Sequence, residues 1–246
     1  MARDARACAA ATLLVALLTA GCATLPPGVS EHRWPDGRVY RGTWQDGQPH
    51  GQGVETRPDG TTYNGAWRAG KWHGFGELLT DDGLYQGEFR DGRRHGHGVQ
   101  FGRDGIYRGD WQDDREHGFG ELTGSHGSVY RGEWRAGLRA GEGSHEGANG
   151  ARYQGEWLDD LPHGHGIYVA PSGTVYSGTW RAGRQRGTGR LVEASGVVYE
   201  GAFADALRNG FGIVQRPDGS GYAGEWQDDR RHGQGARHLP RPFVFT

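Results

Sequence analysis

Histidine is the residue type in this chain that most readily suggests chemistry. Twelve histidines occur in 246 residues, and two pairs, His95 with His97 and His163 with His165, are separated by a single residue. On a regular β-strand each pair shares a face and could hold one metal ion. No cysteine and no fixed carboxylate accompanies them, and equivalent histidines recur too far apart to share an ion. We predict no metal site and no cofactor, and expect the histidines to form hydrogen bonds at the start of a strand.

Neither of two common catalytic signatures applies to this chain. Residues Gly219 to Gly224 match the Gly-x-Gly-x-x-Gly dinucleotide fingerprint, which requires a preceding strand and a following helix. These glycines instead belong to a turn and a strand of a repeated unit. No Gly-x-Ser-x-Gly occurs. Only residues 23–35 and 237–246 lie outside both the leader and the repeats, too few for a catalytic domain, so we predict that the protein is not an enzyme.

The repeated unit is Tyr-x-Gly-x-Trp/Phe, then a turn, then His-Gly-x-Gly, and it recurs nine times at intervals of 22 or 23 residues. Its tyrosine, glycine and aromatic residue are two positions apart, so a β-strand places all three on one face. A fixed period of this size indicates stacked supersecondary units. The tyrosines are Tyr40, Tyr63, Tyr85, Tyr107, Tyr130, Tyr153, Tyr176, Tyr199 and Tyr222. Their aromatic partners are Trp44, Trp67, Phe89, Trp111, Trp134, Trp157, Trp180, Phe203 and Trp226, and we assign all eighteen a structural role.

Turn-forming residues divide each unit into two strands. Glycine or aspartate stands three residues after the aromatic residue in every repeat but the eighth, which has Ala206. We expect that hairpin to turn differently. The two 22-residue repeats lose one residue next to Asp82-Gly83 and Asp104-Gly105, inside a turn. The histidine before the glycine pair is replaced in three repeats, by Ala140, Arg186 and Asn209.

Composition agrees with a thin sheet. The chain contains 47 glycines and only 34% hydrophobic residues, too few for a thick core, while nine tryptophans are present, most of them in register. The formal net charge is −2. Without a basic excess, no nucleic-acid partner is predicted.

The repeated unit resembles the MORN repeat family, whose unit is Tyr-x-Gly-x-Trp-x-x-Gly followed by His-Gly-x-Gly and Asp-Gly. Choline-binding cell-wall repeats also stack aromatic hairpins, but their paired tryptophans and shorter period are missing here. The resemblance implies an all-β fold, an elongated, twisted, solenoid-like antiparallel sheet of about nine stacked β-hairpins. We place the array at residues 33–238 and a tail at 239–246. The family is also associated with acidic phospholipids and with scaffolding.

The first 21 residues read as a signal peptide: Arg3 and Arg6 precede an apolar stretch from Ala7 to Leu18. Thr19-Ala20-Gly21-Cys22 resembles a bacterial lipobox, which implies acylation of Cys22, followed by a tether through residue 32. An ordinary cleaved secretory peptide and a retained anchor are the alternatives. Acylation predicts an exported membrane lipoprotein, located, if the cell is diderm, at the outer membrane or the periplasmic face.

Candidate binding residues lie between the two glycines of each pair. If these glycines lie beneath the aromatic rings, the residue between them faces outward, which singles out Phe75, His97, Phe119, His165 and Phe211. The alternative is that this face is the core. Our first hypothesis is a lipid-anchored scaffold for an envelope protein or polymer. Peripheral phospholipid binding and cell-wall glycan binding through exposed aromatics are the alternatives, and open sheet edges suggest an end-to-end homodimer.

Overall fold

The computed structural model describes residues 26–239, and this range consists of β-strands and turns without a helix. It therefore holds no helix that could span a bilayer. The chain divides after Gly118 into two compact units. The predicted signal peptide, Cys22 and all of the predicted tail but Leu239 lie outside the described residues.

The first unit contains eight strands and the start of a ninth: β1 (Val29–Arg33), β2 (Val39–Gln45), β3 (Gln48–Thr56), β4 (Thr62–Arg68), β5 (Lys71–Thr80), β6 (Gly83–Arg90), β7 (Arg93–Gly102), β8 (Gly105–Gln112) and β9 (Arg115–Gly124). The second unit contains the rest of β9 and ten further strands: β10 (Val129–Arg135), β11 (Leu138–Glu146), β12 (Arg152–Leu158), β13 (Leu161–Val169), β14 (Val175–Arg181), β15 (Arg184–Val192), β16 (Val198–Ala204), β17 (Leu207–Gln215), β18 (Gly221–Gln227) and β19 (Arg230–His238).

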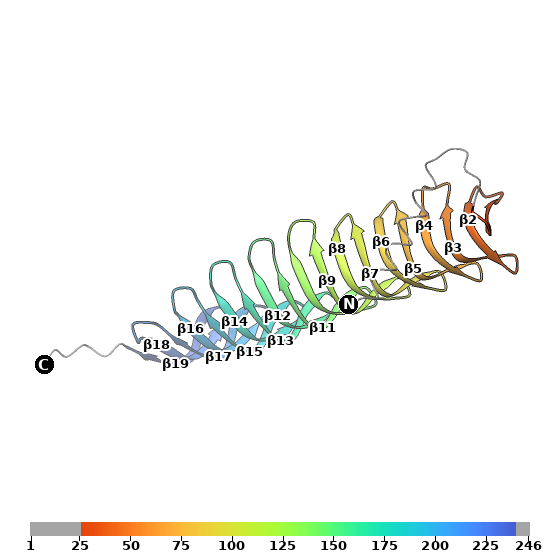
Figure 1. Cartoon of the computed structure of the whole chain (residues 1–246). Coiled ribbons are helices and arrows are strands. Elements are labelled where there is room, and N and C mark those ends of the chain that lie inside the picture. Colours follow the sequence, from red (N-terminus) through yellow and green to blue (C-terminus); the bar gives the residue numbers. More distant parts are fainter. Residues whose placement is uncertain (1–25, 240–246) are drawn as a thin grey trace, which may run out of the picture. The chain divides into compact units, whose positions relative to one another are not determined.

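Consecutive strands pair antiparallel within each unit, in chain order (Figure 1). The glycines of the repeat set the register. Gly53 of β3 lies opposite Gly42 on one side and Gly65 on the other, and the same triple recurs in the second unit around Gly166. The prediction of an all-β, open antiparallel sheet of hairpin repeats is confirmed.

The hairpins turn through two residues that both have positive φ. Asp46 and Gly47, for example, have φ values of 51° and 72°. Two left-handed residues in a two-residue loop define a type I′ turn, whose twist matches that of the flanking strands. The expectation that the eighth hairpin turns differently is wrong, because Asp205 and Ala206 have φ values of 48° and 69°. The strand pairing on both sides fixes the turn, and Ala206 accepts the strain.

The connections between hairpins are longer in most repeats. A typical one closes with a hydrogen bond from Gly60 N–H to Arg57 C=O, and Asp59 Oδ1 accepts the N–H of Thr61. In the two 22-residue repeats the strands run on until only Asp81–Asp82 or Arg103–Asp104 separates them. The missing residue is therefore absorbed in a turn, as the sequence predicts.

Burial alternates along the first strand of each hairpin. In β10, Tyr130, Gly132 and Trp134 are buried while Arg131 and Glu133 are exposed. The repeat tyrosines form the centre of the core, with six of them less than 2% exposed. Because each tyrosine packs edge-on against the aromatic residue of its own hairpin and usually of the next, the core is a continuous row of rings within each unit.

The nine aromatic partners, to which the sequence assigns one structural role, differ in burial. Trp44 of the first hairpin is only half-buried, because no hairpin of the array precedes it. His32 and Trp34, which lie ahead of the first repeat, contact its ring instead, at centroid distances of 5.6 and 6.2 Å. The other eight are buried: Trp67, Phe89, Trp111, Trp134, Trp157, Trp180, Phe203 and Trp226.

The aromatic partners also differ in hydrogen bonding. Trp67 Nε1 donates to the carbonyl of Gly53 in the preceding hairpin at 3.1 Å. Phe89 and Phe203 have no ring N–H, and they pack edge-on against the tyrosines of their own and the preceding hairpin. Within the described residues, Trp44 Nε1 has no hydrogen-bond partner. The tryptophan hydrogen bond is thus absent at Trp44, Phe89 and Phe203, which contribute to the core through ring packing.

The structure adds one strand that the repeat pattern does not contain. β1 lies mostly within the segment 22–32 that the sequence suggested as a tether, and it pairs antiparallel with β2. Arg41 on β2 donates a hydrogen bond to Glu31 on β1. This contact lowers the pKa of the Glu31 carboxyl, so the pair is charged at neutral pH.

Candidate functional site

The hydroxyl of every repeat tyrosine binds the backbone of its own strand. Tyr153 Oη donates to the carbonyl of Glu156 at 2.9 Å, and Tyr85 Oη donates to the carbonyl of Glu88 at 3.1 Å. All nine tyrosines make this bond to the residue three positions further on. The bonded carbonyl lies where the strand pairing becomes irregular, so the tyrosine fixes the place at which each hairpin bends.

The two glycines of the His-Gly-x-Gly segment have different roles. The first, such as Gly141, has a φ of 54° and forms the bulge, since β10 and β11 lose register there. The second, such as Gly143, lies against the tyrosine, because a Cβ placed on it would be 2.4 Å from Tyr130 Oη. Only the second glycine lies beneath the ring, so the expectation that both do is wrong for the first.

The bulge separates the paired histidines that suggested a metal site. His95 is 20% exposed and its Nδ1 faces Asp113 at 3.9 Å, whereas His97 is 82% exposed and its Nδ1 lies 2.5 Å from Asp110. The expected common face is absent because the left-handed Gly96 between them, with a φ of 62°, interrupts the alternation. No group of three histidine, cysteine or acidic side chains able to hold a metal ion occurs in residues 26–239.

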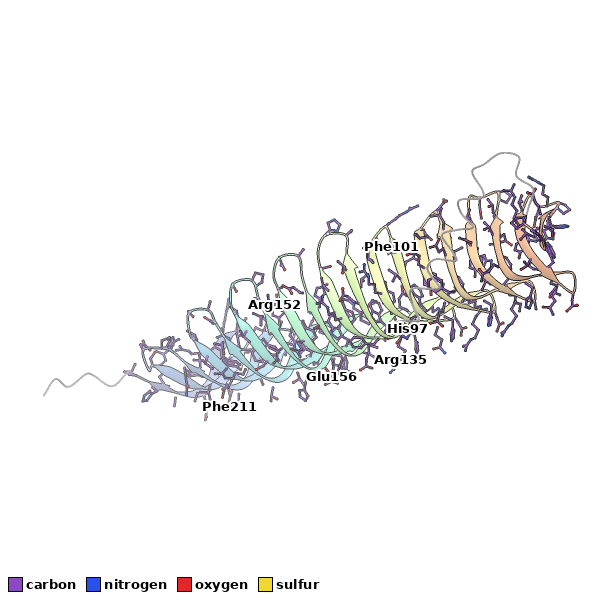
Figure 2. All side chains as sticks on the ribbon, viewed as in Figure 1. His97, Phe101, Arg135, Arg152, Glu156 and Phe211 are labelled. Atoms are coloured by element: carbon purple, nitrogen blue, oxygen red, sulfur yellow. The ribbon has the colours of Figure 1, made fainter. Side chains whose placement is uncertain are left out.

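The residues between the two glycines are exposed. Phe75 is 48% exposed, and Phe119 and Phe211 are each 63% exposed; Figure 2 labels Phe211 and His97 on the ribbon. His165 is also exposed. The alternative in which these rings form the core is excluded, because the core is the tyrosine row.

We call these residues and the strand residues beside them the outer column. Its first set is Gln52, Phe75, His97, Phe119, Glu142, His165, Thr188, Phe211 and Gln234. Its second set is Thr43, Ala66, Glu88, Asp110, Glu133, Glu156, Thr179, Ala202 and Glu225. The column includes six acidic residues and no lysine or arginine.

Carboxylates therefore lie beside the exposed rings. Phe75 is directly opposite Glu88, and Phe211 is directly opposite Glu225. The acidic side chains also bind the bulge: Glu88 accepts the N–H of His97 at 3.2 Å, and Glu156 accepts the N–H of His165 at 2.7 Å. The column is thus apolar at the phenylalanines and negative between them.

The histidine that precedes the glycine pair contacts the next hairpin. His73 Nδ1 is 3.9 Å from Asp91, which is the first turn residue of that hairpin. In the eighth repeat, Asn209 replaces histidine and donates to Asp228 at 3.3 Å, at the equivalent turn position. Within the described residues, the buried Nδ1 atoms of His73 and His95 have no hydrogen-bond partner, so the expected hydrogen bonding is not found at these two atoms, whose contacts with the next hairpin are longer.

Sequence reasoning missed a second contact between repeats, which we call the Arg–Asp turn contact. The backbone N–H and Nε of Arg139 both donate to Asp160 Oδ1 at 3.0 Å, and its Nη2 donates to the Asp160 carbonyl at 2.9 Å. The guanidinium carbon also lies 4.6 Å from the Trp157 ring centroid. The same set of bonds joins Arg94 to Asp114 and Arg208 to Asp229.

A signal for this contact is present in the sequence. Aspartate replaces glycine at the second turn position in the fourth, sixth and ninth repeats. In each case the preceding repeat has arginine at the second position after its own two-residue turn. The two departures from the consensus occur together. Comparing departures between neighbouring repeats would have identified the pairs.

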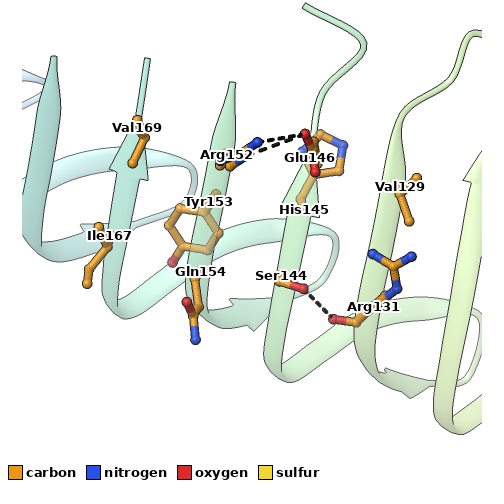
Figure 3. A pocket seen from close by; sticks show the side chains of 10 residues that line it. All are labelled: Val129, Arg131, Ser144, His145, Glu146, Arg152, Tyr153, Gln154, Ile167 and Val169. Carbon is orange, nitrogen blue, oxygen red and sulfur yellow. Dashed lines mark hydrogen bonds and ion pairs between the residues drawn. The ribbon is translucent and has the colours of Figure 1, made fainter. Parts of the chain in front are cut away.

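The second unit has a small hollow on β10 to β13 (Figure 3). Its volume is about 210 Å³, and Ser144 leaves room between Arg131, Gln154 and Ile167. Arg152 and Glu146, which also line it, form an ion pair at 3.2 Å.

His145 also lines this hollow. Burial, with a smaller contribution from the charge of Arg139, lowers the pKa of the His145 imidazole. The lowered pKa favours the neutral form of the ring.

The fold and the repeated contacts define a β-hairpin repeat protein, built from one unit that recurs along the chain. The MORN repeat model matches residues 40–62, 63–84, 85–106, 107–129, 130–152, 153–175, 176–197, 199–221 and 222–240. The chain therefore belongs to the MORN repeat family. Repeats of this family form scaffolds that bind membranes or proteins, and the family is generally non-catalytic.

A comparison with curated proteins finds no match. Among solved structures, the chain is similar to the TCP10 domain of Danio rerio CPAP in complex with a peptide of STIL, at 14% identity and a TM-score of 0.40, covering 87% of this chain and 97% of that one. It is also similar to the Drosophila melanogaster SAS-4 TCP domain in complex with a proline-rich motif of Ana2, at 11% identity and a TM-score of 0.31, covering 89% and 96%.

Proposed function

We propose that this protein is an exported, lipid-anchored, non-catalytic scaffold that binds an envelope protein through its outer column. The observation that carries the proposal is the exposure of Phe75, Phe119 and Phe211 at a repeat position that points away from the core. Large apolar side chains at such positions lose contact with water when a partner covers them, and aromatic residues are enriched at the centres of protein interfaces.

The charge of the outer column specifies the chemistry of the partner. Glu88 and Glu225 lie directly opposite Phe75 and Phe211, and neither column set includes lysine or arginine. A complementary surface has apolar pockets bordered by basic groups. The same charge disfavours acidic phospholipid headgroups, which attract clusters of basic residues.

Export and anchoring rest on residues ahead of the repeats. Cys22 follows Thr19-Ala20-Gly21 at the end of a short apolar stretch. Acylation there would hold the repeats at a membrane surface without any contact between the repeats and lipid. Mass spectrometry of the mature N-terminus should show an acylated Cys22, and Cys22→Ser should release the protein from the membrane fraction. An unmodified Cys22 would contradict the anchor but not the binding role of the outer column.

Crosslinking and capture from an envelope extract tests the binding role. The protein with Phe75→Ser, Phe119→Ser and Phe211→Ser should lose the captured partner. The matched control replaces three other exposed residues, all leucines, with serine and should retain it; these are Leu138, Leu158 and Leu207. Equal capture by both variants would show that the outer column is not the binding surface.

Two further measurements separate the alternatives from this proposal. A leaderless Cys22→Ser protein should not float with vesicles that contain acidic phospholipid; firm flotation would favour a peripheral lipid-binding module. Titration with a panel of cell-wall glycans should leave tryptophan fluorescence unchanged. Quenching that disappears in the triple phenylalanine variant would favour glycan binding.

A further inference from the structure

The Arg–Asp turn contact occurs a fourth time in part, at Arg231 of β19. The guanidinium carbon of Arg231 lies 5.0 Å from the ring centroid of Tyr222. Arg94, Arg139 and Arg208 lie at 5.7, 5.6 and 5.7 Å from the tyrosines of their own hairpins. Arg231 therefore takes the place that arginine has in the complete contacts.

The other half of the contact is a turn of the following hairpin. In each complete contact the arginine carbonyl accepts the N–H of an aspartate, at 3.1 Å for Arg94 and Asp114, and the carboxylate accepts from the arginine. A tryptophan three residues before the aspartate lies on the guanidinium, 4.3 Å away in the case of Trp111. The complete contact thus requires an aromatic residue, followed three positions later by an aspartate in a left-handed turn.

β19 has the features of a strand that can accept another strand. Within the described residues of its unit it is in register with β18 alone, and all nine of its residues are exposed. Such an edge leaves a row of backbone N–H and C=O groups for pairing. A hollow of about 480 Å³ adjoins it, lined among others by Trp226, Arg216, Arg230 and Arg231.

The positive charge of β19 indicates which kind of strand could pair with it. The strand includes Arg230, Arg231 and Arg237 and no acidic residue. A second copy that pairs β19 with β19 in the antiparallel sense would bring these like charges together, which is unfavourable. An acidic segment is favoured. Aspartate is the expected partner of Arg231, because the equivalent arginines each bind an aspartate.

We propose that β19 binds a segment of a partner protein in which a strand carries an aromatic residue and, after two further residues, leads into an aspartate in a left-handed turn. The segment adds antiparallel to β19, its aromatic ring lies on Tyr222 and Arg231, and its aspartate accepts the N–H and the guanidinium of Arg231. Gln234 of the outer column lies on β19, but the Arg231 contact involves none of the column's phenylalanines, so the two modes of binding can be tested separately.

The probe is a labelled synthetic peptide with the sequence of residues 105–116, which contains Trp111 and Asp114. Fluorescence anisotropy with the whole protein should show saturable binding. Replacing the peptide's aspartate at the Asp114 position by alanine, or Arg231→Gln in the protein, should each weaken binding about tenfold or more, equivalent to about 1.4 kcal/mol. The two changes together should add little, because they remove the same contact.

Matched controls identify the surface. Arg186→Gln removes an exposed arginine of β15 and should bind the peptide as the unmodified protein does. The triple phenylalanine variant of the outer column should also bind normally, so a failure of either binding proposal can be recognised separately. Equal binding of the aspartate and alanine peptides, or no binding of either, overturns the inference. A dimer that depends on Arg231, detected by light scattering, would overturn it in favour of a second copy.

Discussion

The hydroxyl of Tyr176 donates a 3.0 Å hydrogen bond to the carbonyl of Thr179, three residues along the same strand. The bonded carbonyl lies where β14 and β15 lose register, between Gly178 and Trp180. In most β-sheets such a carbonyl would bind a neighbouring strand or water. Here a side chain of the same strand satisfies it, so each hairpin carries the group that holds its own bend.

Removing this hydroxyl should destabilise the hairpin. Tyr176→Phe leaves the Thr179 carbonyl without its donor in a partly buried site, and we expect a loss of about 1–3 kcal/mol in the free energy of unfolding. Denaturant unfolding followed by circular dichroism measures it. Tyr168→Phe, at a half-buried tyrosine on β13, is the control and should cost less. Equal losses would show that the bond to Thr179 contributes nothing particular.

Gly98 and Gly102 of β7 should respond differently to the same substitution. A Cβ at Gly98 would lie 2.2 Å from Tyr85 Oη and 2.4 Å from the ring, whereas a Cβ at Gly102 would meet nothing closer than 3.6 Å. Gly98→Ala should therefore displace Tyr85 and cost on the order of 3 kcal/mol, the upper end of the usual range for overpacking. Gly102→Ala should be neutral or should stabilise the protein by up to about 1 kcal/mol, because alanine loses less conformational entropy in a strand than glycine does. Thermal unfolding of both variants compares them directly.

Ala206 offers a substitution that should stabilise the protein. Its φ of 69° is left-handed, and this conformation costs a non-glycine residue about 1–2 kcal/mol. Ala206→Gly should raise the midpoint of denaturation, with a gain of about 1 kcal/mol after the larger entropy of the unfolded glycine is counted. Ala204→Gly, made in the regular strand β16, should lower it instead. Two shifts of the same sign would contradict this account of the turn.

High pH should unfold the protein as buried tyrosines ionise. Burial raises the pKa of Tyr130 and Tyr176 to about 12, while tyrosine in an unfolded chain ionises near about 10. Both states keep the proton below about pH 10, so the stabilising effect is fully present there. Above that value the unfolded chain loses protons first, and stability falls as the pH rises through about 12.

Tyrosinate absorbance and circular dichroism, recorded along one alkaline titration, test this behaviour. Both signals should change together, because most tyrosines ionise only when the core opens. Full ionisation near pH 10 in a protein that still shows its native circular dichroism would contradict the burial of these hydroxyls. The midpoint should move to lower pH in Tyr176→Phe, which starts from a less stable core.

The sequence predicts the hairpins well because their requirements are periodic. Tyr130 and Trp134 must share a face of one strand, and turn residues must recur between successive strands, so spacing alone indicates the strands and the connections. The distinct roles of Gly141 and Gly143 could not be separated, since both positions show only glycine. One requires a left-handed φ and the other requires space for a ring, and neither need is visible in the residue type.

The sequence predicts the candidate site only at positions whose residue type differs from repeat to repeat. The outward direction of Phe211 followed from its place between two glycines, and its exposure agrees. The Arg139–Asp160 contact depends on a pairing between adjacent hairpins, and a search for features shared by all repeats overlooks it. The incomplete burial of Trp44 was overlooked for the same reason, because it depends on what precedes the first repeat. The acylation of Cys22 stays a prediction, because that residue lies outside the described range.

The tryptophan contacts also determine how the protein would respond to force. Trp157 Nε1 donates to the Gly143 carbonyl, and Trp180 Nε1 donates to the Gly166 carbonyl, each reaching back only 14 residues. A load applied along the chain therefore needs to break the contacts of one hairpin at a time. Pulled from its ends, such a chain is expected to lengthen in steps of one repeat, about 80 Å each when fully extended.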